Sequence, residues 1–198
     1  MKGDTMMTKT AAVMIADGCE EVEALSPVDV IRRLGGKADM VGLDKLKITS
    51  AHQVTLTCDK VLDDSLLDYD IVIFPGGTTG AKNLRDNDQL MELMQKRAQQ
   101  SKWNAAMCAA PTAFSRYGLL DGTHYTVFPG MEGQIQDEAK DATHTDNIVE
   151  IDKDAHILTS RGPATAFAYS YAIAETLGYD TTDVREAMQY NYLTDNIQ

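Results

Sequence analysis

Residues 68–77, DYDIVIFPGG, decide the fold that we expect for this chain. An unbroken apolar run, Ile71 to Phe74, lies between acidic residues and a Pro-Gly-Gly turn. Continuous apolar runs are typical of strands buried on both faces, whereas strands with one wet face alternate. The stretch therefore predicts a central strand of a parallel sheet, with a tight turn at its carboxyl end.

Similar strands alternate with helical patterns along the chain. Further strands are predicted at 10–15, 37–43 and 103–107, a hairpin at 147–160, and extended or hairpin structure at 49–62. Helices are predicted at 23–36, 87–100, 111–120, 162–178 and 181–193. This order predicts an α/β protein with a mostly parallel central sheet and helices on both faces. We expect one domain over residues 10–198, preceded by a flexible leader, residues 1–9.

Composition excludes several classes of protein. Acidic residues outnumber basic ones 30 to 18, and the net charge of -12 disfavours binding to nucleic acid or anionic membranes. No apolar run approaches the roughly 20 residues that span a bilayer, and no export signal is seen, so a cytoplasmic protein with reduced thiols is expected. The three cysteines are far apart, with no CxxC pair and no histidine at ligand spacing, which predicts no metal site.

Three stretches should meet where ligands bind in parallel sheets, at the carboxyl ends of the strands. They are ADGCEEVEA (16–24), PGGTTGAKN (75–83) and CAAP (108–111). The glycine stretch fits neither a dinucleotide motif nor a P-loop. It is either a tight turn or part of an oxyanion site. In the second case the backbone N–H groups of Gly77 and Ala109 would bind the oxyanion.

Cys108 has the surroundings of a nucleophile on a sharp strand-to-helix turn. Ala106 and Ala110 are small residues two positions to either side, as in G-x-S-x-G. The following helix N-terminus is expected to favour the thiolate. The alternative is a buried, inert cysteine. Cys19 and Cys58 have acidic neighbours and are expected to be structural.

The acidic stretch at 20–23 has an ordinary explanation as well. Carboxylates in the first turn of a helix interact favourably with its dipole, and most such side chains are solvated. Glu23 follows Val22 and is able to turn towards the sheet edge instead.

Four stretches together resemble the DJ-1/ThiJ/PfpI superfamily, and within it the DJ-1-like branch. They are ADGCEEVEALSPVDVIRRLG, DIVIFPGGTTGAKNL, AAMCAAPTAF and LTSRGPATAFAYSYAIAETLG, and the likeness extends over residues 10–178. The resemblance implies a flavodoxin-like three-layer sandwich. It also implies a homodimer with the first helix near the interface, which involves Arg32 and Arg33.

The resemblance also assigns roles to residues. Cys108 becomes the reactive cysteine, and Glu23 becomes a protonated carboxyl that donates a hydrogen bond to it. The glycine pair of the family falls on Gly76 and Gly77, which with Ala109 supply backbone donors. The expected pocket residues are Phe128, Pro129, Arg161, Gly162 and Pro163.

One departure from the family concerns histidine. Some branches have a histidine directly after the cysteine, where this chain has Ala109, and DJ-1 has one before a proline where this chain has Phe128. No histidine is therefore assigned as a base, which disfavours a Cys-His protease or amidase.

The implied function is glyoxalase or deglycase activity on small carbonyls such as methylglyoxal, without metal or organic cofactor. Cys108 would attack the aldehyde and Glu23 would move a proton between the two carbons. The alternative is a stress protein that senses oxidants through Cys108 without turnover.

Overall fold

The computed structural model describes residues 8–197 and is built on a seven-stranded sheet with the order β10-β11-β7-β6-β1-β2-β5. Every neighbouring pair is parallel except β10 and β11. The stretch quoted first forms β6, between β7 and β1, as predicted. The strands are β1 (Thr10–Ile15), β2 (Lys37–Gly42), β5 (Lys60–Val61), β6 (Ile71–Phe74), β7 (Trp103–Met107), β10 (Val149–Asp152) and β11 (Ile157–Ser160).

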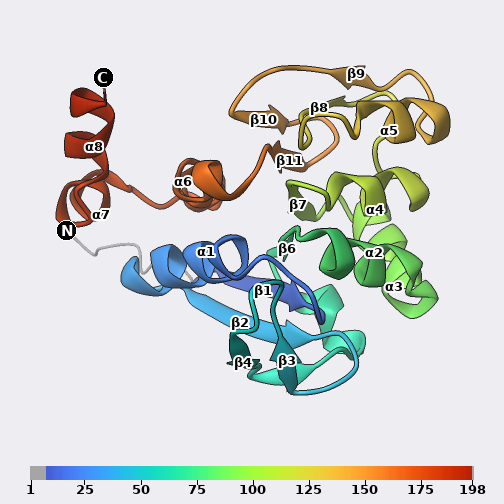
Figure 1. Ribbon diagram of the computed structural model, residues 1–198, viewed down its shortest axis with the longest axis horizontal. Helices are drawn as coiled ribbons and strands as arrows, with labels where there is room; N and C mark the ends of the chain where they lie inside the picture. The colour runs from blue at the N-terminus through green and yellow to red at the C-terminus, as the bar shows by residue number, and fades with distance from the viewer. Residues whose placement is uncertain (1–7, 198) are drawn as a thin grey trace, which may run out of the picture.

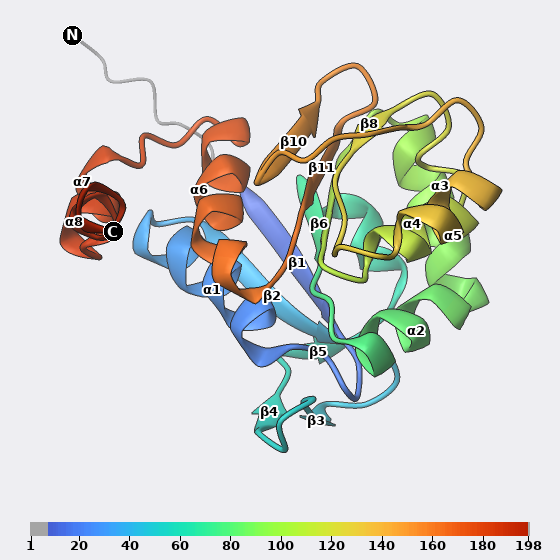
Figure 2. The ribbon, with the colours of Figure 1, turned by 45° about the horizontal axis from the view of Figure 1, so that its top comes forward.

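Helices cover both faces of this sheet (Figures 1 and 2). One face carries α1 (Glu21–Arg33) and α6 (Ala166–Thr176). The other carries α2 (Thr78–Asp86), α3 (Asp88–Gln99), α4 (Pro111–Arg116) and α5 (Glu132–Glu138). The predicted three-layer α/β sandwich is confirmed. Among residues 8–197, no helix has the length and apolar character that crossing a bilayer requires.

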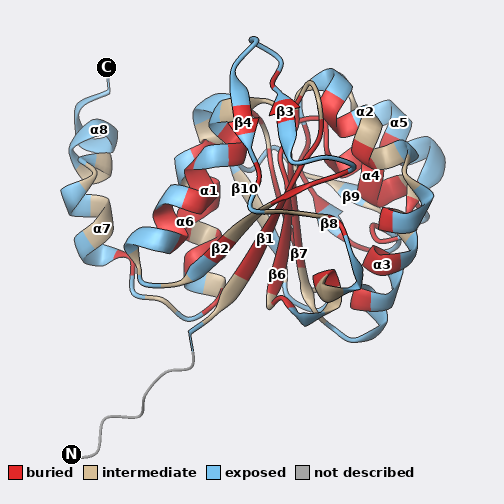
Figure 3. Cartoon of the chain, turned by 90° about the horizontal axis from the view of Figure 1, so that it is seen from below, coloured by how far each residue is buried: buried red, intermediate tan, exposed pale blue. Residues whose placement is uncertain are grey.

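Strand β1 contributes side chains to the hydrophobic cores on both faces of the sheet. Successive side chains of a strand point to opposite faces. Ala12 and Met14 therefore pack under the helices α2 to α5, while Val13 and Ile15 pack under α1 and α6. All four are fully buried, and Figure 3 shows the central strands buried along their length.

The predicted hairpin at 147–160 is confirmed, and the stretch predicted as extended or hairpin structure lies partly in a hairpin over 47–57. Strands β3 (Lys47–Thr49) and β4 (Thr55–Thr57) pair antiparallel beside the sheet edge, and β10 pairs with β11. A further small sheet joins β8 (His124–Tyr125) to β9 (Thr143–His144). Short 3-10 turns span Asp64–Asp68 and Pro163–Thr165, so α6 begins later than the predicted 162.

Other predictions of local structure were wrong. Helix α2 begins at Thr78, directly after the glycine pair, where only a turn was expected, and no helix was predicted where α5 lies. The last predicted helix is divided at Gln189, whose φ of 59° is left-handed, into α7 (Thr182–Ala187) and α8 (Tyr190–Asn196). Of the predicted leader, residues 1–7 lie outside the described residues, and Lys9 is held by Asp70 and Tyr179.

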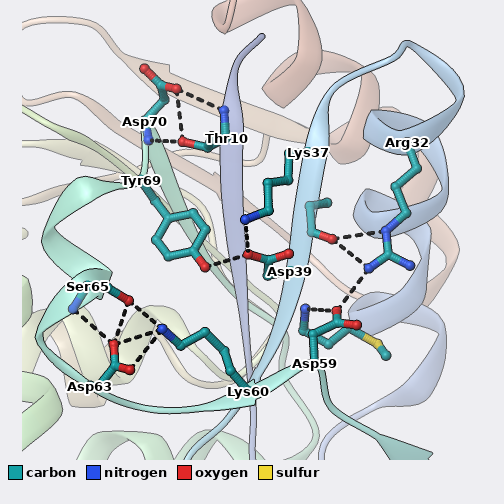
Figure 4. A network of polar contacts seen from close by, with 12 residues as sticks. Thr10, Arg32, Lys37, Asp39, Asp59, Lys60, Asp63, Ser65, Tyr69 and Asp70 are labelled. Atoms are coloured by element: carbon teal, nitrogen blue, oxygen red, sulfur yellow. Dashed lines mark hydrogen bonds and ion pairs between the residues drawn. The ribbon is translucent and has the colours of Figure 1, made fainter.

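A polar network fixes α1 to the sheet edge (Figure 4). Arg32 donates to the Ala38 carbonyl oxygen through Nε and Nη2, at 2.9 and 2.6 Å, and also pairs with Asp59. Beside it, Tyr69 donates its hydroxyl to Asp39 at 2.6 Å. The C-terminal end of α1 is thereby held in place relative to β2.

A buried arginine fixes the starts of the two central strands. Arg97 on α3 is fully buried and donates to the carbonyl oxygens of Leu66, Tyr69 and Trp103 and to Asn104 Oδ1. Each bond satisfies an acceptor that burial removes from water, and the bonds share one charged donor group. The loops that precede β6 and β7 therefore have defined positions.

Candidate active site

The loops that follow β1, β6 and β7 meet around Gly76. A Cβ atom at this position would lie 2.6 Å from Cys108 Cβ, 2.8 Å from Glu23 Oε2 and 3.0 Å from the Ala109 nitrogen. Only glycine leaves room for such an approach. The predicted convergence of the three stretches at the carboxyl edge is seen.

Cys108 lies on a strained turn between β7 and α4. Its φ of 59° is a left-handed conformation that costs a non-glycine residue about 1–3 kcal/mol when the surroundings enforce it. Its N–H donates to the Ser160 carbonyl oxygen, and its own carbonyl accepts from the Phe128 N–H, both at 3.0 Å. Ala106 and Ala110 are fully buried, so larger side chains would not fit beside this turn.

Glu23 is a fully buried carboxyl on the first turn of α1. Its Oε2 accepts from the Gly76 N–H at 2.7 Å, and the carboxyl is in contact with the Cys108 thiol. Burial raises the pKa of Glu23 to about 7, although the Gly76 bond opposes the rise. We predicted that Gly76 would serve an oxyanion, but its N–H is engaged by this carboxyl instead.

The predicted lowering of the Cys108 pKa is wrong. Burial, and then the negative charge of Glu23, raise the pKa of the thiol to about 12. The N–H groups of Gly77 and Ala109 face the thiol and oppose this rise. Helix α4 has only six residues, so its dipole does not outweigh burial.

The thiol and the carboxyl are best described as one unit. Losing the first proton from the pair is feasible near neutral pH, because the pKa of Glu23 is about 7. Losing the second would place two negative charges in contact, which is reflected in the high pKa of Cys108. Near neutral pH the singly charged pair therefore holds one proton, located on sulfur or on oxygen.

Cys108 lines a pocket of about 320 Å³. It is 9% exposed, as part of the pocket lining. The lining residues are Glu20, Ala51, His52, Gly77, Thr78, Cys108, Ala109, Phe128, Met131 and Pro163.

The predicted pocket residues fall into two groups. Phe128 and Pro163 line the pocket, whereas Pro129, Arg161 and Gly162 lie outside its lining. Arg161 is paired with Asp146 at 3.0 Å. Gly162 lies behind the Phe128 ring, where a Cβ would be 3.4 Å from Cδ2.

Sequence reasoning missed His52. Its Nδ1 lies 3.0 Å from Glu21 Oε1 and 3.6 Å from Glu20 Oε2. One ligand atom from each of these residues lies within 4.8 Å of the others, so the group is able to hold a metal ion. His52 is 31 residues from Glu21, and only the extended or hairpin structure predicted at 49–62 hinted that the chain turns there.

Tyr169 is a second residue that the sequence did not reveal. It lies within the apolar helix α6 and is fully buried, and the negative charge of Glu23 contributes to raising its pKa. Among residues 8–197, neither its hydroxyl nor Glu23 Oε1 has a hydrogen-bond partner. The buried side of the carboxyl is therefore poor in donors, which favours its protonated form.

Comparisons with known proteins agree on one family. The model of the DJ-1/PfpI family matches residues 9–176. The Parkinson disease protein 7 homolog of Danio rerio is 34% identical over 177 residues, covering 87% of this chain and 91% of the relative. Glutathione-independent glyoxalase DJR-1.2 of Caenorhabditis elegans is 30% identical over 175 residues, covering 85% and 89%. The crystal structure of Drosophila melanogaster DJ-1beta matches with a TM-score of 0.85 at 30% identity, covering 92% and 98%.

We predict that Gly76→Ala disrupts the site. The new methyl group would collide with Cys108 and Glu23, and the loops must separate to accept it. We expect a loss of about 1–3 kcal/mol in the free energy of unfolding, as for other overpacked sites. Urea denaturation measures this, and Gly133→Ala is the matched control because a Cβ there meets nothing within 4 Å. Equal stability of the two variants would contradict the predicted crowding.

We also predict that Glu23 makes stability fall as the pH rises. Between its ordinary pKa of 4.5 and its folded pKa of about 7, the folded protein holds a proton that the unfolded chain has released. Over this window the free energy of unfolding should drop by about 3 kcal/mol from this group alone. Urea denaturation of wild type and Glu23→Gln at several pH values isolates the effect. A difference between the two proteins that stays constant with pH would disprove it.

Proposed function

The chain belongs to the DJ-1/PfpI family, and on that premise we propose that it converts small reactive carbonyls such as methylglyoxal into hydroxy acids. The observation that carries the proposal is Cys108 in the lining of a pocket, with the buried carboxyl of Glu23 beside it. The glyoxalase name of the Caenorhabditis elegans relative also supports it.

The first step is addition of the thiol to the aldehyde. Glu23, as the carboxylate, takes the Cys108 proton while the sulfur–carbon bond forms. Charge develops on the carbonyl oxygen, and the N–H groups of Gly77 and Ala109 are near enough to the sulfur to stabilise it. Glu23 then passes the proton on to that oxygen, which gives the hemithioacetal and restores the carboxylate. A thiolate prepared in advance is not required, because the base is in contact with the thiol.

The second step moves hydrogen between the two carbons of the bound substrate. Glu23 removes the proton from the carbon bonded to sulfur and returns it to the neighbouring carbon, while the hydroxyl proton on the first carbon is released and the ketone oxygen on the second takes up a proton. A pKa of about 7 suits both halves of this transfer, since the group is then almost equally ready to accept and to donate. The product is a thioester, which water hydrolyses to the hydroxy acid and the free thiol.

The space around the thiol supports activity on larger adducts as well. A second pocket of about 410 Å³ shares Thr78, Ala109 and Met131 with the first. A carbonyl attached to an amine or thiol would place its reactive end at Cys108 and its remainder in the second pocket. We therefore include deglycase-type reactions in the proposal.

A second function, oxidant sensing, is favoured by the same contacts. Oxygen atoms added to the sulfur would meet the Gly77 and Ala109 N–H groups and the protonated form of Glu23. These donors would stabilise a sulfinate.

The expected homodimer and cytoplasmic location remain predictions. Val22 and Leu25 on α1 are 46% and 38% exposed, which supports an interface on this helix. The solution mass, compared with 21.7 kDa for one chain, tests the dimer.

We expect Cys108→Ala to abolish methylglyoxal consumption, because no other described cysteine lines the pocket. Cys58→Ala is the matched control. Cys58 is buried elsewhere, and burial raises its pKa to about 11, so its removal should leave turnover within about twofold of wild type. Lactate release, followed enzymatically, is the measurement. Turnover that persists in Cys108→Ala refutes the mechanism.

For the sensing function, we expect limiting peroxide to add two oxygen atoms at Cys108 and none at Cys19, which is 1% exposed and does not line the pocket. Peptide mass spectrometry after a short exposure locates the added mass. Replacing Glu23 with Asp should slow the second oxidation, because the shorter side chain withdraws the donor. Equal oxidation of all three cysteines would show that the site has no special reactivity.

A further inference from the structure

We propose that Phe128 is a specificity-determining residue, which selects α-oxoaldehydes whose ketone carbon carries an uncharged aromatic group. The inference rests on the proposed carbonyl chemistry of Cys108 and names a substrate class for that site. Phenylglyoxal is the simplest member of this class, and methylglyoxal is the small reference compound.

Phe128 is bonded directly to the turn that carries the thiol. Its N–H donates to the Cys108 carbonyl oxygen at 3.0 Å, and its own carbonyl oxygen accepts from the Met131 N–H at 3.1 Å. All three residues line the same pocket. These backbone bonds therefore keep an aromatic ring and a thioether in the lining that the nucleophile shares.

The Phe128 ring is supported from behind and remains exposed. A Cβ atom at Gly162 would lie 3.4 Å from Cδ2 and 3.7 Å from Cε2 of the ring, so the glycine backbone packs against it. Phe128 is nevertheless 44% exposed. A large apolar side chain that is held in place and left exposed at a pocket offers surface for a ligand to cover, and covering it removes that surface from water.

The rest of the pocket has the size and character that an aromatic substituent needs. Ala51, Ala109, Met131 and Pro163 contribute further apolar groups to the lining. The volume of about 320 Å³ lies within the range of roughly 300–1,000 Å³ that is typical of sites for drug-sized ligands. The Met131 thioether is a favourable neighbour for an aromatic ring. The pocket is therefore larger than methylglyoxal requires.

The charges at the pocket disfavour an anionic substituent. None of the described lining residues is a lysine or an arginine, and Glu20 contributes a carboxyl. Nδ1 of the histidine in the lining, His52, already faces Glu20 at 3.6 Å and Glu21 at 3.0 Å. A carboxylate moved from water into this pocket would lose hydration without gaining a cationic partner.

The order of atoms in the substrate places its substituent against the ring. The aldehyde carbon bonds to the Cys108 sulfur, and the ketone carbon follows it, so the group on the ketone carbon extends along the lining. There it meets Phe128, the aromatic side chain of that lining. Two aromatic rings gain offset or edge-to-face contacts in addition to the surface that they bury, whereas a methyl group covers little of the ring.

The first test compares Phe128→Ala with Tyr192→Ala as the matched control. Tyr192 on α8 is also an exposed aromatic residue, at 65%, and it does not line the pocket. We expect the ratio of kcat/KM for phenylglyoxal to kcat/KM for methylglyoxal to fall about tenfold in Phe128→Ala and to keep its wild-type value in the control. Comparing ratios between proteins removes the difference in intrinsic reactivity of the two aldehydes. Mandelate and lactate release are the measurements.

A second measurement does not depend on turnover. We compare the rates at which N-benzyliodoacetamide and iodoacetamide alkylate Cys108, since both reagents are uncharged and have the same reactive carbon. The ratio of the benzyl rate to the iodoacetamide rate should fall about threefold or more in Phe128→Ala and stay unchanged in Tyr192→Ala. Peptide mass spectrometry assigns the alkylation to Cys108.

These outcomes separate the inference from the proposed function. A wild-type protein that consumes neither aldehyde refutes the proposed function, and the alkylation ratio then decides the inference alone. Either ratio, if it is the same in Phe128→Ala as in wild type, overturns the inference. So does a wild-type thiol that neither reagent alkylates, because Phe128 would then not border a site that ligands reach.

The selection against charge is tested on the wild type. We expect the anionic 4-carboxyphenylglyoxal to have a kcat/KM about tenfold below that of phenylglyoxal, because its carboxylate finds no cationic partner in the lining. Equal kcat/KM values for the two compounds would overturn the assignment of an uncharged substrate class.

Discussion

The hydrogen bond from the Gly76 N–H to Glu23 Oε2 is the contact on which the site depends. It joins the end of the central strand to the first turn of α1, and the missing side chain at Gly76 lets Cys108 close over both. The other end of α1 is held by Arg32, so the carboxyl is positioned by a helix fixed at both ends. Reactive groups on such rigid elements keep their geometry without rearrangement during reaction.

The site consists of two buried weak acids, Glu23 and Cys108, which share one proton. Burial alone would keep both Glu23 and Cys108 neutral, and their contact prevents both from being charged. The protein thereby obtains a nucleophile that is protected at rest and activated by its own neighbour. The same arrangement serves addition to a carbonyl and stabilisation of an oxidised sulfur, which is why one pair supports both proposed functions.

The sequence predicted those structural features that depend on neighbouring residues or on a repeated pattern. The apolar run at Ile71–Phe74 and the small residues around Cys108 determine a central strand and a sharp turn, and both are present. The thiol pKa was mispredicted because a helix N-terminus is visible in sequence and burial is not. His52 and the buried Arg97 were missed because their partners are brought near only by the fold.

The alternation of side chains between the two cores has a consequence at the elbow. Cys108 belongs to the core under α1 and α6, while the next residue, Ala109, belongs to the core under α2 to α5. The sulfur and the amide that faces it are thus anchored in opposite halves of the molecule. A substitution that alters the packing of either half would change how the sulfur and the amide are aligned. The reactivity of the thiol is therefore sensitive to substitutions at positions far from any ligand.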